Sequence, residues 1–269
     1  MKLEELLAQA RRNEQIQRRL DKVEDFMLGC TGLGELLRGL GQQLVEVYAL
    51  RRVGLGLEAG DKGLREAVEA AGGLGGWCRW MDSQQLDRLG LGRKPVLVVR
   101  PGPGDVGEVV DAQGLGSAAL VPLWAGQRRL GVLVLGDESA LRYQPGLDTY
   151  FLERLGAKLS QALVAMAAVE RAKMAERCRA VVEMAGAAAH ELAQPLTTLV
   201  LGLERLAREA GVNSPLGKRV IRLRQEAERL GELVERIRRV RAYITRPYLG
   251  EMTIVDICAA SNASEEEQV

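Results

Sequence analysis

Residues 184–200 read MAGAAAHELAQPLTTLV and contain His190, the only histidine of the 269-residue chain. Apolar residues recur here alternately three and four positions apart, a spacing that lines one side of a helix packed against other helices. His190 follows this row by one position, so we expect it at the edge of the apolar side. Gln194 and Thr197 lie further along its face of the helix. The row consists of Ala189, Leu192, Leu196, Leu199, Leu203 and Leu206.

Pro195 interrupts what is otherwise a helical pattern. Proline lacks the backbone N–H and its ring clashes with the preceding turn, so the interior of a helix normally excludes it. Residues 190–196, HELAQPL, resemble the H-box of two-component sensor histidine kinases. In that family the histidine is phosphorylated on a ring nitrogen, within a dimerisation and phosphotransfer domain of two helices per protomer. The alternative is a histidine on the surface of an ordinary coiled coil.

The resemblance implies a role for each polar residue of the motif. His190 is the predicted phosphoacceptor, because an imidazole at neutral pH is substantially unprotonated and nucleophilic. Glu191 is placed to orient the ring or to accept its proton during attack. Gln194 resembles the amide that positions a water in kinases with phosphatase activity. Pro195 is expected to kink or loosen the helix, so that a partner domain can approach the ring.

Composition limits the class of protein. With 37 basic and 36 acidic residues the formal net charge is +1, so no overall field points to nucleic acid or to a membrane surface. No segment approaches the roughly 18–20 apolar residues that span a bilayer, and the charged N-terminus does not resemble a secretory signal. The four cysteines include no C-x-x-C pair. We therefore expect a cytoplasmic protein with reduced thiols and no metal site.

The first half of the chain alternates helical and strand patterns. Apolar residues at helical spacing predict a charged amphipathic helix over residues 1–29, which we expect to join a coiled coil in a dimer. Short apolar runs bounded by glycine and proline predict strands. The further predicted elements are helices at 33–49 and 64–71, strands at 53–57, 95–100, 117–124 and 130–136, and a turn at 101–104.

Residues 117–137, SAALVPLWAGQRRLGVLVLGD, have the pattern of two strands joined by a tight turn, and a helix follows them. Together with the preceding order of helices and strands, this segment resembles the end of a GAF domain, over about residues 30–160. The resemblance implies an antiparallel sheet flanked by helices at residues 30–146. GAF domains bind small ligands in a pocket between sheet and loops, and many serve only for dimerisation.

Trp77, Cys78 and Trp80 follow the glycine-rich run of residues 72–76. No lysine follows these glycines at the spacing of a phosphate-binding loop, so we interpret the run as a loop over one side of the sheet. Aromatic side chains offer large contact areas, which makes these three residues the candidates for the wall of a ligand pocket. The alternative is core or lid packing. No cofactor is expected beyond such an unidentified small ligand.

One long helix is predicted from residue 147 onward, with residues 147–178 as a signalling helix that leads to a phosphotransfer hairpin at 179–247. The pattern breaks near Gly211, and Ser214 followed by Pro215 has the signature of a helix N-terminus. Two antiparallel helices bury little surface alone, so we expect a homodimer that forms a four-helix bundle. The apolar row of the second helix is Val220, Leu223, Ala227, Leu230, Val234, Ile237 and Val240.

The sequence thus predicts an α+β chain that ends in a polar tail at residues 248–269. This tail is too short for an ATP-binding domain, because a domain needs at least about 50 residues. We expect a two-component protein whose His190 exchanges phosphoryl groups with a receiver-domain aspartate, or receives them from a separate kinase's ATP-binding domain. Two alternatives stay open, a non-catalytic dimeric adaptor that docks receivers and a fragment of a sensor kinase. The sequence leaves open whether the chain is an enzyme.

Overall fold

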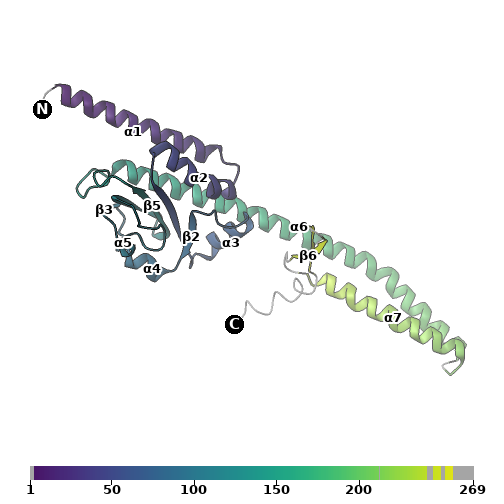
Figure 1. The fold of residues 1–269 in the computed structure, drawn as a ribbon. Coiled ribbons are helices and arrows are strands. Elements are labelled where there is room, and N and C mark those ends of the chain that lie inside the picture. Colours follow the sequence, from purple (N-terminus) through teal and green to yellow (C-terminus); the bar gives the residue numbers. More distant parts are fainter. Residues whose placement is uncertain (1–2, 212, 241–244, 250–251, 257–269) are drawn as a thin grey trace. The chain divides into compact units, whose positions relative to one another are not determined.

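The computed structural model confirms a mixed α+β protein (Figure 1). The chain divides into two compact units, Met1–Ala172 (unit 1) and Lys173–Val269 (unit 2). The structure describes residues 3–211, 213–240, 245–249 and 252–256. Most of the predicted polar tail, from residue 257 onward, lies outside the described residues.

A five-stranded sheet is the centre of unit 1, with the strand order β2-β1-β5-β4-β3. Three strand pairs are antiparallel as predicted, whereas β1 and β2 run parallel. The antiparallel prediction is wrong for this pair because helix α3 (Lys62–Ala70) returns the chain between the two strands, the kind of connection that parallel pairing needs. The strands are β1 (Arg52–Glu58), β2 (Cys78–Met81), β3 (Val96–Val99), β4 (Ser117–Ala125) and β5 (Arg128–Asp137).

Strand β1 gives the sheet two different faces, because leucine and glycine alternate along it. Its two leucines are fully buried in the core on one face. On the other face, a Cβ at Gly54 would overlap Val109 and Val110, and a Cβ at Gly56 would overlap Met81. One face is therefore filled by the strand's own side chains, and the other is filled by side chains that reach in from loops and neighbouring strands.

Three long helices cover the leucine face of the sheet and, together with the shorter α3, form one apolar core with it (Figure 1). They are α1 (Leu3–Gly29), α2 (Leu33–Tyr48) and the first part of α6 (Tyr150–Ala210). Each contributes a row of buried side chains at helical spacing, which is how an amphipathic helix packs on a sheet. The rows are Leu20, Val23 and Met27 in α1, Leu36, Leu40 and Leu44 in α2, and Leu155, Leu159 and Leu163 in α6.

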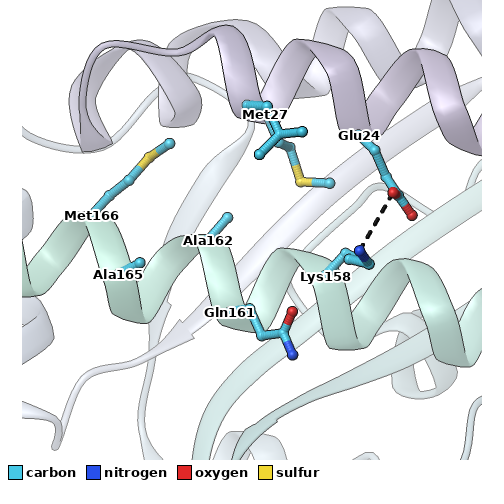
Figure 2. A pocket seen from close by; sticks show the side chains of 8 residues that line it. Glu24, Met27, Lys158, Gln161, Ala162, Ala165 and Met166 are labelled. Atoms are coloured by element: carbon cyan, nitrogen blue, oxygen red, sulfur yellow. Dashed lines mark ion pairs between the residues drawn. The ribbon is translucent and has the colours of Figure 1, made fainter.

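Helices α1 and α6 leave a groove of about 320 Å³ between them (Figure 2). Met27 of α1 and Met166 of α6 point into it from opposite sides. Beside them, Nζ of Lys158 lies 3.5 Å from a carboxylate oxygen of Glu24. A half-exposed ion pair of this kind adds little stability, so the packing of the two helices depends mainly on their buried apolar rows.

The glycine face is covered by shorter elements. Helices α4 (Ser83–Arg88) and α5 (Pro103–Val106) contribute Leu86 and Val106, which pack with Leu115 into a second core. The predicted turn at residues 101–104 is wrong in its second half, where Pro103 starts the single turn of α5. Proline suits that first helical position, since the backbone N–H there has no partner within the helix.

A β-bulge ties the β4–β5 hairpin to α6. The strand register shifts between Leu123 and Trp124, which takes one backbone N–H out of the ladder. The N–H of Trp124 donates instead to Oγ of Ser160 on α6, at 3.2 Å. Ser160 is only 3% exposed. Both polar groups are therefore satisfied by each other, and the hairpin and the helix share a directional contact within an otherwise aliphatic core.

Unit 2 contains the rest of α6, helix α7 (Pro215–Arg238) and a two-stranded sheet of β6 (Thr245–Leu249) and β7 (Met252–Val255). Helix α7 ends at Arg238, before the predicted end of the hairpin at residue 247, and the two strands lie across that boundary and in the first part of the predicted tail. Pro247 has no N–H to donate and biases the preceding residue toward extended backbone, so this segment favours a strand over a helix.

The close packing of β5 against β1 at Gly131 can be tested by substitution. The φ of Gly131 is 148°, and a Cβ there would overlap the carbonyl oxygen of Gly56 on the neighbouring strand. We expect Gly131→Ala to lower the free energy of unfolding by about 2–4 kcal/mol, through backbone strain and separation of the two central strands. Urea denaturation measures the change. Gly92→Ala, where the added methyl meets open space, is the control, and equal stabilities of the two variants would contradict this packing.

Candidate functional site

The apolar row predicted on α6 separates into two rows in unit 2. Ala189 is 1% exposed and Leu196 is half-buried, and both face α7, where Val220 and Ala227 are buried. The two helices touch at Leu196, whose Cδ2 lies 3.6 Å from the position of a Cβ on Gly231. The seven-residue spacing from Ala189 to Leu196 therefore marks the side of α6 that closes the hairpin.

The second row is exposed. Its members lie three residues after those of the first row, at seven-residue intervals, and α7 carries an equivalent set. All six side chains are between 50% and 61% exposed in a single chain. They are Leu192, Leu199 and Leu206 on α6 and Leu216, Leu223 and Leu230 on α7. The sequence pattern groups both rows into one seam, and only the packing of the hairpin distinguishes the inner row from the outer one.

The turn between α6 and α7 confirms the predicted helix boundary. Gly211 has a φ of 76°, a left-handed conformation that ends a helix at little cost for glycine. Ser214 is the N-cap of α7, and Pro215 occupies its first position. The hydroxyl of Ser214 accepts the N–H of Gly217 at 2.9 Å. The short turn brings α7 back along α6, and this packing fixes which side of α6 remains open.

His190 lies on that open part of α6. Its side chain is exposed, although the preceding Ala189 is buried against α7. Nε2 of Gln194 lies 3.3 Å from Nε2 of His190. The amide and the ring are within hydrogen-bond distance, and which of them donates depends on the ring tautomer. The arrangement presents an exposed imidazole one helical turn from an amide.

Pro195 leaves a gap in the hydrogen bonding of α6 close to the histidine. The helix continues through this proline, but the carbonyl of Glu191 receives no hydrogen bond from position 195, because proline has no N–H. The hydroxyls of the two threonines that follow donate to carbonyls one turn back, at 2.8 Å and 3.3 Å. The weakest point of this stretch thus lies one residue past His190. A kink at Pro195 stays a prediction.

The arrangement suits phosphoryl transfer. A neutral imidazole nitrogen is a nucleophile at physiological pH, and the exposed carboxylate of Glu191 is next in the chain. Gln194 contacts the ring itself, so it is close to any group bonded there. The roles of Glu191 and Gln194 stay predictions, since each depends on a partner that approaches the open side of α6.

Trp77, Cys78 and Trp80 pack in or against the core of unit 1. The ring of Trp77 lies against Gly41 of α2, and its Nε1 donates to the carbonyl of Leu37 at 2.5 Å. Burial raises the pKa of the Cys78 thiol to about 12, so it stays protonated at neutral pH. These contacts favour core packing, the alternative that the sequence leaves open. A ligand at these three residues stays a prediction.

Two kinds of feature are absent from the part of the chain that the structure describes. No group of three or more His, Cys, Asp or Glu side chains there is arranged to hold a metal ion. No helix there is both long and apolar enough to cross a bilayer.

The hairpin defines the class of protein to which unit 2 belongs. Residues 180–241 match the family described as "His Kinase A (phospho-acceptor) domain", and His190 lies within the match. This confirms the resemblance of the HELAQPL motif and indicates signalling of the two-component, histidine-kinase type.

The family of the chain is identified by a match to its N-terminal part. Residues 1–167 match the family described as "Protein of unknown function, DUF484". Because this match covers more than half of the chain, the chain belongs to the DUF484 family. A comparison with curated proteins finds no match. The GAF resemblance of this part stays a prediction.

The cap of α7 provides a test of the hairpin. Ser214 accepts a hydrogen bond from Gly217 and donates one to the carbonyl of Ala210 at 2.6 Å. We expect Ser214→Ala to destabilise the hairpin by about 1 kcal/mol, as loss of an N-cap usually does. Thermal unfolding followed by circular dichroism measures the effect. Ser214→Thr keeps the hydroxyl and should stay close to the wild type, so a similar loss in both variants would argue against the cap.

Proposed function

We propose that this chain is a cytoplasmic two-component signalling protein in which unit 1 receives an input and His190 carries a phosphoryl group. The observation that supports this most directly is the exposed imidazole of His190 beside Gln194, on a hairpin that matches the phosphoacceptor family. Unit 1 is a GAF-like sensor, an assignment supported by its sheet with a helical layer on one face. Helix α6 belongs to both units and connects input to output.

The phosphoryl group is exchanged with the aspartate of a receiver domain. A ring nitrogen of His190 attacks the phosphorus of the aspartyl phosphate, a P–N bond forms, and the P–O bond to the aspartate breaks with its electron pair leaving on the carboxylate. The proton on the other ring nitrogen passes to Glu191 or to water. The same groups serve the reverse reaction. A separate kinase's ATP-binding domain is a second possible donor of the phosphoryl group.

A second copy of this chain covers the exposed leucine rows of α6 and α7. Both rows repeat every seven residues, the period at which helices interlock in a bundle. Exposed apolar stripes of this length on a solvated hairpin are typical of an interface. The homodimer then forms a four-helix bundle with His190 outside its apolar core.

Transfer to His190 is the first test of the proposed function. Receiver domains encoded beside this chain are phosphorylated with radiolabelled acetyl phosphate and mixed with the purified protein. We expect an acid-labile label on the wild type and none on His190→Ala, because only that imidazole is available as acceptor. Gln194→Ala should still take the label, and the receiver should lose its phosphate more slowly if this amide positions water.

A label that persists on His190→Ala would contradict His190 as the phosphoacceptor. If no label appears while the receiver still binds, the chain is an adaptor that docks receivers. The binding measurement, by titration calorimetry with the same receiver domains, separates that outcome from a wrong choice of receiver.

The dimer interface is tested with two exposed leucines of one helix. Leu199 belongs to the outer row, whereas Leu201 is equally exposed on the side of α6 that carries His190. We expect Leu199→Glu to raise the dimer dissociation constant by about a hundredfold or more, since symmetry removes two buried leucines at once. Leu201→Glu should leave it unchanged. Sedimentation velocity measures both, and equal behaviour of the two variants would place the interface elsewhere.

A further inference from the structure

A cavity of about 700 Å³ opens in unit 1 where β5 ends and α6 begins. Its volume is within the range of roughly 300–1,000 Å³ that small-molecule sites occupy. It is not the pocket that the sequence predicts, because Trp77, Cys78 and Trp80 do not line it. Its walls come from the sheet, from α1 and from the first turns of α6.

The inner wall of the cavity is apolar. Leu135 of β5 and Leu155 of α6 are each only 2% exposed and form its floor. Leu97 of the edge strand β3 and Phe151 and Leu152 of α6 continue this surface. Such a lining binds the hydrocarbon or aromatic part of a ligand, and the aromatic ring adds contact area at low entropic cost.

The carboxylates that line the cavity already have hydrogen-bond or ion-pair partners within the protein. Nη1 of Arg142 lies 2.6 Å from Oδ2 of Asp137, and this guanidinium also donates to two backbone carbonyls at the end of α2. Asp148 accepts the backbone N–H of Tyr150 at 2.9 Å, at the start of α6. Neither carboxylate therefore requires a cationic ligand.

Two polar side chains at the cavity, Arg19 of α1 and the phenol of Tyr48, have no such partner among the described residues. Among the described residues, no acidic side chain lies within ion-pair distance of Arg19. Burial raises the pKa of Tyr48 to about 12, and the nearby charge of Arg19 opposes that rise. The phenol is therefore protonated at neutral pH and available as a hydrogen-bond donor beside a guanidinium.

We propose that this cavity binds a small molecule with an apolar or aromatic body and a single carboxylate. The body lies on the wall formed by Leu97, Leu135 and Phe151. The carboxylate pairs with Arg19 and accepts a hydrogen bond from Tyr48, an arrangement in which charge strengthens the hydrogen bonds. Because the ligand contacts the first turn of α6, it also touches the helix that carries His190. Its action as a signal depends on the proposed function, but its binding does not.

Two fluorescent probes that differ only in charge test this site on the full chain. Anilinonaphthalene sulfonate combines an aromatic body with one anionic group, and N-phenylnaphthylamine is the same body without it. We expect Arg19→Gln to weaken binding of the sulfonate by about tenfold, the usual effect of losing one charge-assisted hydrogen bond, and to leave the neutral probe unchanged. Decanoate, which carries a carboxylate, should displace the sulfonate.

The matched control is Arg18→Gln, because Arg18 precedes Arg19 on α1 but pairs with Glu14 and does not line the cavity. Both substituted positions are exposed, so both variants should fold. The proposal is overturned if Arg19→Gln and Arg18→Gln behave alike, if both probes weaken equally, or if decanoate fails to compete. His190→Ala should bind the probes normally, so the outcome is independent of phosphoryl transfer.

Discussion

The burial of one leucine row of α6 against the sheet is the interaction on which both units depend. Leu155, Leu159 and Leu163 are among the least exposed side chains of the chain, and full burial of each contributes roughly 1.5–3 kcal/mol. An isolated helix is marginal in water, so this row anchors the start of a helix that continues to Ala210. The hydrogen bond from Trp124 to Ser160 adds direction to that aliphatic contact. The same helix then supplies His190, its neighbours and half of the hairpin.

Elements with strong local signals are predictable from the sequence. The Ser214–Pro215 pair specifies a helix start by its own chemistry, and the hairpin of residues 117–137 is specified by two apolar runs around a glycine turn. The HELAQPL motif likewise identifies the phosphoacceptor segment, because its histidine, amide and proline lie at fixed spacing. In each case the deciding residues are neighbours in the chain, so no knowledge of tertiary contacts is needed.

What the sequence does not reveal depends on residues that meet only in the fold. In the sequence, the glycines of β1 indicate only a weak strand. In the structure, Met81 and Val109 fill the space above them. From the sequence, Trp77 is a candidate for the wall of a pocket, but in the fold its ring packs against Gly41 of α2. The cavity beside Arg19 likewise joins α1, the sheet and α6, and its lining follows no periodic pattern. Secondary-structure propensity and the spacing of apolar residues carry no information about such tertiary contacts.

The two leucine rows of α6 are offset by three residues, which corresponds to about 60° around the helix axis. A turn of that size would bring Leu192 and Leu199 to the side where Ala189 and Leu196 now meet α7. The first row contains an alanine and the second only leucines, so the two settings would fill the hairpin with different volumes. His190 would turn with them. The direction in which the imidazole faces is therefore coupled to the rotation of the whole helix about its axis.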